Sequence, residues 1–551
     1  MVDDTELLDA CWAAEVEHND HRPLWDGDID EVERWPRTSV DATDRAKAEL
    51  GALRAQALDA VDRGSDLAPS LQTAADAARL TAVTKEVEAE LTFAHPDLGL
   101  HSYLFWAVND LPLRTAEHGA AYLRKLEGFS GCIDEFRQRL TIASGAGRAP
   151  IASHTARAIE KLDAHLGGAA TADPLLEQAT PSDLDGSQAD AWRQALADAI
   201  ADHVRPALDR LRGTFRDEVL PAGRSDDECG LLHQPGGEER YAELVQVNTA
   251  SGITPEQVHQ TGLDQVARLA EEYRELGAEV FGTSDLTEVF ARITGDELSF
   301  HDADEVVRAA EALHARAEAA APDWFARVPE APCRVRPTTT GSLAYYSSPA
   351  ADGSRPGVFF FNVATPQVWG PNLAATVFHE GVPGHHFQAA LALEADDLHE
   401  MHRRLFLPAF GEGWALYTER LADEMGLYED AVQRLGMLAT DSLRACRLVV
   451  DTGLHAFGWS RERAIQYFLD NAPMQRAEVT AEVDRYIGMP GQATSYMMGR
   501  LAIERCRDRA AETLGPAFSP GQFHDAVLAG GMVSLEALDL AVDRWISDAV
   551  G

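Results

Sequence analysis

The sequence predicts a mainly α protein, a large helical array with one small β-hairpin or sheet. Three observations support this fold class. Apolar residues recur at three- and four-residue spacing over most of the chain. Strand-forming residues gather in one short segment. Hydrophobic residues make up 45% and charged residues 25% of the 551 positions, which is typical of a soluble globular protein with a large core.

Helical periodicity is clearest in four segments, at 42–63, 78–94, 116–140 and 254–277. The last of them opens with Thr254 as N-cap and a proline in the first turn. Two segments rich in Gly, Pro and Asp interrupt the pattern, near 165–190 and 221–241, and are expected to be loops. The second loop predicts a division into an N-terminal helical part, 1–225, and a C-terminal part, 226–551, that carries the functional motifs.

The strand signal lies in residues 334–366, where Thr, Tyr, Val and Phe flank a turn at Asp352-Gly353. This pattern predicts a hairpin directly before the segment with the functional motif. An exposed edge of such a sheet could accept an extended peptide as an additional strand.

The net charge limits the classes of partner that we expect, and the N-terminal sequence bears on the cellular location. The formal net charge is -42, so the surface repels phosphate polymers and anionic lipid, and nucleic acid and membrane partners are not expected. The acidic N-terminus lacks the basic and apolar regions of a secretory signal, and no apolar run is long enough to span a bilayer. We therefore expect a cytoplasmic protein. The six cysteines form no C-x-x-C pair and are expected to be small buried hydrophobic residues.

The segment "HEGVPGHH", residues 379–386, resembles the start of a zinc-peptidase helix without its usual continuation. Zincins place two histidines four residues apart on one helical face, with a glutamate after the first. Here His379 and Glu380 are present, but Pro383 occupies the fourth position. Proline removes an intrahelical hydrogen bond, so the helix that begins near Pro371 is expected to bulge or kink.

The second histidine ligand could be His385 or His386. In an unbroken helix His385 would lie about 9 Å further along the axis than His379 and on a different side. His386 would share the face of His379 but lie two turns away. A bulge that absorbs two residues at 382–384 would bring His385 into place. We prefer His385 because it needs the smaller insertion, and His386 stays the alternative.

A carboxylate downstream is expected to complete the site. Glu412 and Glu419 are seven residues apart in "GEGWALYTERL" and share one side of a helix that starts near Gly411. Glu412 in the first turn would be the third ligand, and Glu419 would orient a histidine through its second nitrogen. The reverse assignment remains open, because Glu419 also forms a four-residue acidic pair with Asp423.

Two histidines and one carboxylate leave a zinc position open for water, which is the arrangement of catalytic sites. Glu380 would take the proton from that water, so the pattern predicts metal-assisted hydrolysis of an amide. A lone His-Glu pair is usually structural. Three histidines in eight residues, with the downstream glutamates, favour a metal site instead.

Three further residues are candidate contacts for the substrate or transition state. His455 lies four residues after Asp451 in an apolar helix, where a satisfied core pair is an equally good interpretation. Tyr496 and Arg500 share a helical face with Gln492. A phenol can stabilise an oxyanion and a guanidinium can hold a carboxylate, although structural hydrogen bonding explains such a set about as often.

Four segments, "HEGVPGHHFQ", "FGEGWALYTERL", "RLVVDTGLHAFGW" and "MPGQATSYMMGRLAIER", together resemble the bacterial and archaeal domain of unknown function 885 family. The match is close over about 230–510 and extends more weakly to nearly the whole chain as one unit. The family is similar to gluzincin peptidases, which implies a zincin-like, largely helical fold around a deep cleft with a zinc ion. "GEGW" resembles the "NEGF"-like segment whose glutamate binds zinc in gluzincin aminopeptidases, which favours Glu412.

Together these features predict a zinc-dependent hydrolase, in the first place a peptidase for short peptides, with Glu380 as general base. One alternative is a catalytically silent helical protein that binds a ligand or partner in the same cleft. Another is a hydrolase of a non-peptide amide. The sequence does not indicate the oligomeric state.

Overall fold

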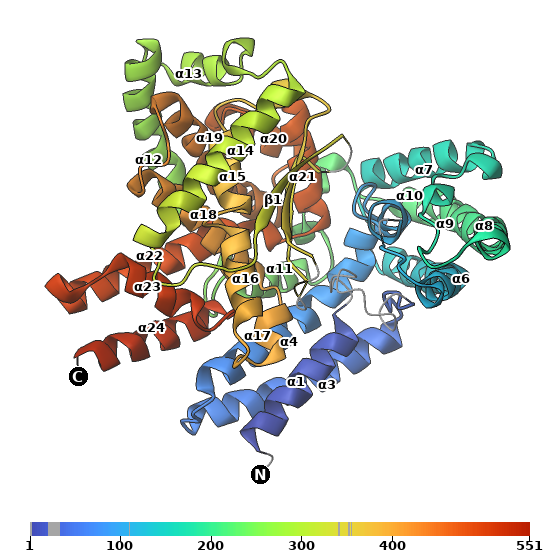
Figure 1. Cartoon of the computed structure of the whole chain (residues 1–551). Helices are drawn as coiled ribbons and strands as arrows, with labels where there is room; N and C mark the ends of the chain where they lie inside the picture. Colours follow the sequence, from blue (N-terminus) through green and yellow to red (C-terminus); the bar gives the residue numbers. More distant parts are fainter. Residues whose placement is uncertain are drawn as a thin grey trace.

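A computed structural model of the chain describes residues 3–19, 33–109, 111–339, 342–350, 353 and 355–550. The protein is mainly helical, and the described part holds one three-stranded sheet, which confirms the predicted mainly α class with a small sheet (Figure 1). The zincin-like arrangement of these elements stays a prediction. No helix in that part is long and apolar enough to cross a membrane.

The N-terminal half contains two groups of helices. The first group packs against the C-terminal part and comprises α1 (Asp4–His18), α3 (Val40–Asp62) and α4 (Ala68–Glu90). The second group forms the lobe on the right of Figure 1 and comprises α5 (Leu100–Tyr103), α6 (Ala116–Gly145), α7 (Ala152–Gly167), α8 (Gly186–Ala199), α9 (Arg205–Thr214) and α10 (Leu220–Ala222).

The C-terminal half surrounds the sheet with helices. Before the sheet come α11 (Gly237–Asn248), α12 (Pro255–Phe281), α13 (Leu286–Ile293) and α14 (Ala303–Ala320). After it come α15 (Leu373–Glu380), α16 (His385–Glu394), α17 (Glu400–Arg404), α18 (Pro408–Glu424), α19 (Ala431–His455), α20 (Arg461–Asn471), α21 (Arg476–Gly488), α22 (Ser495–Leu514), α23 (Pro520–Leu528) and α24 (Leu535–Val550).

All four predicted helical segments are helices in the structure, as α3, α4, α6 and α12. The side chain of Thr254 accepts a hydrogen bond from the backbone N–H of Gln257 and forms a capping box, which explains the start of α12. The two predicted loops lie between α7 and α8 and between α10 and α11. Short 3₁₀ turns interrupt both loops.

The sheet has the order β1 (Cys333–Thr338), β3 (Gly357–Asn362), β2 (Ala344–Ser347). Strands β2 and β3 pair antiparallel, which confirms the predicted hairpin. Of the predicted turn, Asp352 lies outside the described residues, and Gly353 has a φ of +71°. The hairpin prediction was incomplete, because β1 pairs with β3 in parallel and makes it the central strand. The connection from β1 to β3 passes through β2, which local sequence patterns do not reveal.

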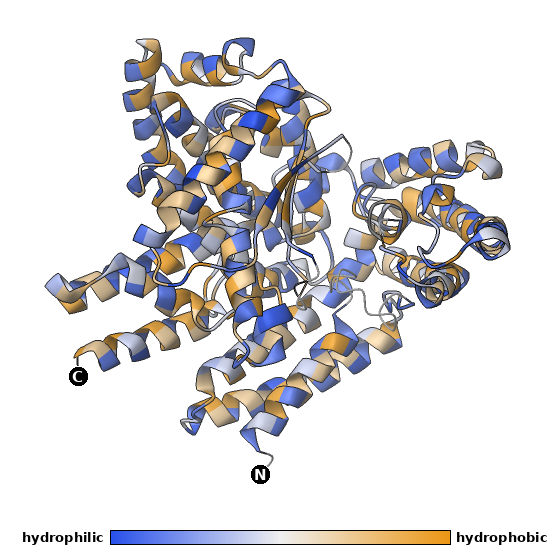
Figure 2. Ribbon diagram, viewed as in Figure 1, coloured by the Kyte–Doolittle hydropathy of each residue, from blue (hydrophilic) through white to orange (hydrophobic). Residues whose placement is uncertain are grey.

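The two largest of the four hydrophobic clusters among the described residues form the main cores. The larger joins α1, α3 and α4 to the helices and sheet of the C-terminal half, and the smaller lies within the lobe formed by α5–α10. Figure 2 shows apolar and polar residues alternating along most helices, as expected for helices with one buried face. The predicted division at 225/226 stays a prediction. All six cysteines are buried with free thiols, as expected.

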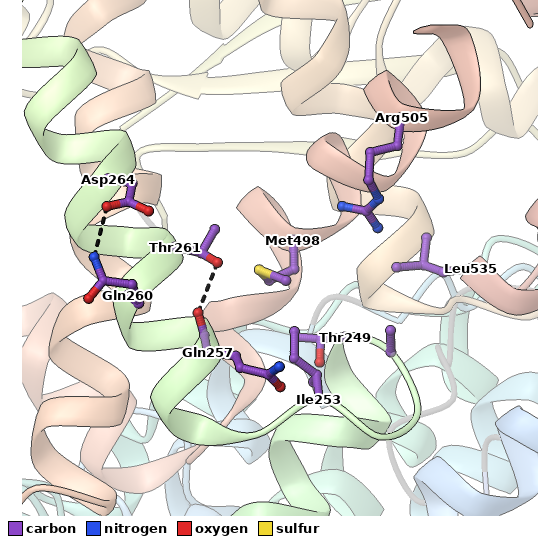
Figure 3. Close-up of a pocket in the computed structure, with 10 residues that line it drawn as sticks. Thr249, Ile253, Gln257, Gln260, Thr261, Asp264, Met498, Arg505 and Leu535 are labelled. Atoms are coloured by element: carbon purple, nitrogen blue, oxygen red, sulfur yellow. Dashed lines mark hydrogen bonds between the residues drawn. The ribbon is translucent and has the colours of Figure 1, made fainter. Parts of the chain in front are cut away.

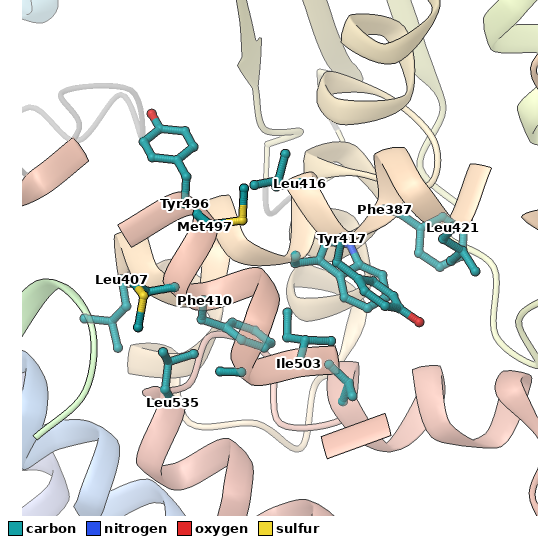
Figure 4. Packing of buried hydrophobic residues seen from close by; sticks show 14 of the residues in the cluster. Phe387, Leu407, Phe410, Leu416, Tyr417, Leu421, Tyr496, Met497, Ile503 and Leu535 are labelled. Carbon is teal, nitrogen blue, oxygen red and sulfur yellow. The ribbon is translucent and has the colours of Figure 1, made fainter. Parts of the chain in front are cut away.

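Helices α18 and α22 pack unusually closely in the larger core (Figure 4). A Cβ added at Gly499 would lie 1.8 Å from the carbonyl oxygen of Ala409, and one at Gly413 would lie 2.6 Å from the backbone of Gly499. Only glycine allows this approach of two helix backbones. The contact fixes α18, and with it the two glutamates that face α15.

Candidate metal centre

The chain does not bulge at the histidine motif but leaves the helix altogether. Helix α15 ends at Glu380 and α16 begins at His385, so the expected single kinked helix is wrong. The four residues between them form a turn that includes Pro383. His379 therefore lies in the last turn of one helix, and His385 is the first residue of the next.

Two features hold this turn in place. A Cβ at Gly384 would lie 1.9 Å from the carbonyl oxygen of His379, so only glycine fits there. The indole Nε1 of Trp414, on α18, donates a hydrogen bond to the carbonyl oxygen of Pro383 at 3.0 Å. Trp414 is fully buried, so the turn is anchored to the same helix that carries Glu412 and Glu419.

The structure brings His379, His385 and Glu412 together. Glu412 Oε2 lies 3.5 Å from His379 Nε2 and 3.4 Å from His385 Nε2, and one ligand atom from each of the three residues lies within 4.8 Å of the others. The two imidazole planes are nearly perpendicular, at 88°. Helix α18 begins at Pro408 and not near Gly411, so Glu412 lies in the second turn.

These distances fit a small divalent cation. Ligand atoms 2.0–2.2 Å from a tetrahedral ion lie roughly 3.4 Å from one another, and two imidazole nitrogens with one carboxylate oxygen are a zinc donor set. His379 is almost completely buried, whereas the side chains of His385 and Glu412 are each 14% exposed. The group of three is therefore open on the side of His385 and Glu412.

Glu419 holds the imidazole of His379 in this orientation. Its Oε1 lies 2.8 Å from His379 Nδ1, which leaves Nε2 directed at Glu412. The hydroxyl of Thr440, on α19, donates a hydrogen bond to the other carboxylate oxygen of Glu419. This arrangement corresponds to the orienting role predicted for Glu419, and Asp423 is instead paired with Arg434 at 2.7 Å.

The electrostatics of the site follow from its burial. Burial alone would lower the pKa of His379, but hydrogen bonds with Glu412 and Glu419 outweigh it and raise the pKa to about 9. Burial tends to raise the pKa of Glu412, but the two imidazoles outweigh it and hold the pKa well below its usual range. Burial raises the pKa of Glu380, and the nearby imidazoles only partly oppose this rise.

The alternative ligand His386 faces away from this group. Its Nδ1 lies 2.9 Å from the hydroxyl of Tyr346 on β2, and its Nε2 lies 3.0 Å from the carbonyl oxygen of Ala331. Burial lowers its pKa to about 4, so the ring is neutral and Nε2 donates to the carbonyl. His386 ties α16 to the sheet.

Two predicted substrate contacts have structural partners. His455 is fully buried, with Nδ1 accepting from the backbone N–H of Leu231 at 3.1 Å and Nε2 directed at the carbonyl oxygen of Tyr486 at 3.1 Å. Arg500 is buried in an ion pair with Asp441 at 2.6 Å. No contact among the described residues joins either side chain to the group of three, which leaves their predicted roles without geometric support.

Tyr496 lies in different surroundings, next to three arginines that the sequence analysis did not consider. Arg447 lies 4.3 Å from the centre of its ring, Arg444 lies 5.9 Å away, and Nη2 of Arg485 lies 3.5 Å from its hydroxyl. The signal was present in "DSLRACRLVV", where two arginines three residues apart interrupt an apolar helix. Buried arginines at helical spacing indicate either ion pairs or an anion site.

A pocket of about 450 Å³ lies elsewhere, between α12 and α22 (Figure 3). Its walls include Gln257, Asp264, Met498 and Arg505, and no residue of the histidine and glutamate group. The deep cleft expected at the metal site stays a prediction.

Comparison with known proteins shows the family to which the chain belongs. Residues 25–542 match the family model described as bacterial protein of unknown function (DUF885), so the chain belongs to this family. The match covers most of the chain and confirms that part of the resemblance seen in the sequence. No curated protein matches.

Two solved structures share the fold over nearly the whole chain. A protein from Colwellia psychrerythraea, described as a putative lipoprotein, is 25% identical, with a TM-score of 0.86 and 99% of each chain covered. A protein from Shewanella oneidensis, described as a putative lipoprotein of unknown function, is 18% identical, with a TM-score of 0.70 and 98% of each chain covered.

Proposed function

We propose that this protein is a zinc-dependent hydrolase, and in the first place a peptidase for short peptides. The observation that carries the proposal is the convergence of His379, His385 and Glu412 from three helices, with Glu419 orienting one histidine. Close ion pairing does not explain this group, because among the described residues Glu412 has no ion pair shorter than those at 3.4 and 3.5 Å.

The roles of the residues follow from their positions. His379, His385 and Glu412 would hold the ion, and Glu419 would fix the tautomer of His379. A bound zinc ion would polarise the substrate carbonyl and make a water molecule more acidic. Glu380 lies next to His379 at the end of α15, where its carboxylate can accept the proton of the attacking water and pass it to the leaving amine.

Metal content tests the site directly. We expect near-stoichiometric zinc in the protein purified without chelator and loss of zinc in His385→Ala, measured by plasma mass spectrometry. His386→Ala and the exposed His301→Ala are the controls and should keep the metal. Absence of metal in the native protein after zinc is supplied, or equal loss in the controls, would contradict the proposed site.

Hydrolysis tests the mechanism. Glu380→Gln should keep the metal but lose at least about 100-fold in kcat, because the amide cannot accept a proton. Turnover of a peptide library, followed by mass spectrometry, measures the loss. Undiminished turnover in this variant would exclude Glu380 as the base. Bound zinc with no hydrolysis of peptides would favour a non-peptide amide substrate or a binding protein.

For the location we retain the expectation of a cytoplasmic protein. The descriptions of the two structural neighbours suggest a lipoprotein as the alternative. Fractionation of the native host, with detection by antibody, separates the two, since a lipoprotein would sediment with the membranes.

A further inference from the structure

A cluster of three arginines and one tyrosine lies beside the candidate metal centre. Arg444 and Arg447 extend from α19, Arg485 extends from α21, and Tyr496 lies in the first turn of α22. The guanidinium groups surround the tyrosine ring at the distances given above. We call these four residues the arginine cluster.

The arginine cluster has more positive charge than its neighbours neutralise. Glu482 is its one close carboxylate, 2.8 Å from Arg447 and 3.7 Å from Arg485. Arg444 lies 4.0 Å from Glu419, which is already committed to His379. Three cations therefore share one carboxylate of their own among the described residues.

Two hydrogen-bond donors in the arginine cluster are also unsatisfied among the described residues. Nη1 of Arg447 and Nε of Arg444 are buried and have no hydrogen-bond partner in the described part of the chain. Arg447 is only 4% exposed, so water does not readily satisfy its donor. Buried donors and charges of this kind are normally paired, and an anion would satisfy both needs at once.

The cluster is close to the candidate metal centre and open on one side. Nη2 of Arg444 lies 4.0 Å from Oε1 of Glu419, and the same oxygen lies 2.8 Å from Nδ1 of His379. The side chains of Arg444 and Arg485 are 14% and 25% exposed. Figure 4 shows the hydroxyl of Tyr496 pointing away from the hydrophobic cluster.

We propose that the arginine cluster holds the C-terminal carboxylate of a peptide, so that the enzyme removes one or two residues from the carboxyl end. This inference rests on the proposed peptidase function. Guanidinium groups bind a carboxylate through paired hydrogen bonds, and a single free carboxylate matches the unbalanced charge. One or two extended residues span roughly 3.5–7 Å. A short reach of this kind suits Arg444, which lies 4.0 Å from the same Glu419 carboxylate that lies 2.8 Å from His379.

The reaction is ordinary hydrolysis. The hydroxyl of water bonds to the carbonyl carbon of the peptide bond near the C-terminus, the C–N bond breaks, and the proton goes to the leaving amine. An amino acid or dipeptide leaves from the arginine cluster with its carboxylate unchanged. A blocked C-terminus removes the group that the cluster binds.

Two peptides that differ only at the C-terminus test this proposal. We expect the N-acetylated tetrapeptide Ala-Ala-Ala-Phe to be hydrolysed at least 10-fold faster, in kcat/KM, as the free acid than as the amide. Arg444→Met should abolish this preference, mainly through KM for the acid. The exposed Arg463→Met, which removes an arginine that stacks on Trp459, should keep it. The acid-to-amide ratio cancels any general loss of folded protein.

A binding measurement separates this inference from the proposed function. The free-acid peptide should bind to the metal-free protein in isothermal titration calorimetry, while the amide and Arg444→Met should show at least 10-fold weaker binding. Equal hydrolysis of acid and amide would overturn the carboxylate subsite and leave the peptidase intact. No hydrolysis of either would overturn the peptidase, and the calorimetry would still decide the subsite. Tighter binding of inorganic phosphate than of the acid would overturn the assignment to a carboxylate.

Discussion

At the scale of single residues, the orientation of each side chain decides which histidines of the "HEGVPGHH" motif can bind a metal and which one bonds to the sheet. His379, His385 and His386 lie within eight positions, yet two converge on Glu412 and the third bonds to the sheet. The sequence predicted the three candidate ligands and Glu419. The sequence could not show that His386 has hydrogen-bond partners at Tyr346 on β2 and at the carbonyl oxygen of Ala331, because both residues are distant in sequence.

Glu419 provides a test at this scale. Glu419→Gln should weaken zinc binding by about 10- to 100-fold, because the amide orients His379 less strongly and supplies no charge. Competition with a chromophoric chelator measures the affinity. Asp423→Asn, on the same helix but paired with Arg434, is the matched control. An equal loss in both variants would argue against an orienting role.

Asp451 provides a second test. It is fully buried and accepts hydrogen bonds from the Tyr241 hydroxyl at 2.5 Å and the Gly491 backbone N–H at 3.0 Å. Burial raises its pKa from 3.8 to about 7. The folded protein thus holds this proton more tightly than the unfolded chain, so the stabilisation is complete below pH 3.8 and is lost as the pH rises to about 7.

Asp451→Asn cannot titrate. The difference in unfolding free energy between the native protein and this variant should therefore change between pH 4 and pH 7, by up to about 4 kcal/mol, and stay constant above pH 8. Urea denaturation of both proteins across this range measures it. A difference that does not vary with pH would show that Asp451 is ionised throughout.

At the scale of elements, two glycine contacts place the helices of the candidate site. Gly384 lets the chain turn between α15 and α16, and Gly499 lets α22 approach α18. Proline in the motif predicted an interruption of the helix correctly. It did not predict a complete break between two helices. The hydrogen bond that holds the turn comes from Trp414 on α18, about thirty residues further along the chain, and local sequence does not reveal it.

Gly499→Ala tests the contact between helices. The added methyl would meet the Ala409 carbonyl, a backbone atom that cannot rotate away, so we expect a loss of about 1–3 kcal/mol or more in stability. Gly131→Ala, in open space on α6, is the control and should stabilise the protein by about 0.5–1 kcal/mol. Thermal unfolding compares them. A melting temperature of Gly499→Ala equal to that of the native protein would mean that α18 and α22 accommodate the methyl group without loss of stability.

At the scale of the whole molecule, the larger core crosses the predicted division at 225/226. Leu7, Leu71 and Val87 belong to the same core as the sheet and α18. Local periodicity identifies the helices correctly but carries no information on which distant helices share a core. For the same reason, the local sequence pattern did not predict the parallel pairing of β1 with β3.

A fragment of residues 226–551 should therefore fail to fold cooperatively, because it would expose the apolar face that α1, α3 and α4 cover. Co-expression with residues 1–225 should restore soluble, cooperatively unfolding protein. Circular dichroism during thermal unfolding and gel filtration measure both outcomes. A fragment that folds alone would support two independent domains.

The sequence by itself determined the helical class, the main helix positions, the hairpin and the short list of ligand candidates, because periodicity, caps and motif spacing are local properties. Only the tertiary structure decided that His385 and not His386 joins His379 at Glu412, how three arginines gather around Tyr496, and which helices share a core. Those outcomes depend on contacts between segments that are far apart in the chain, where burial and hydrogen bonding select one arrangement among many that the local pattern allows.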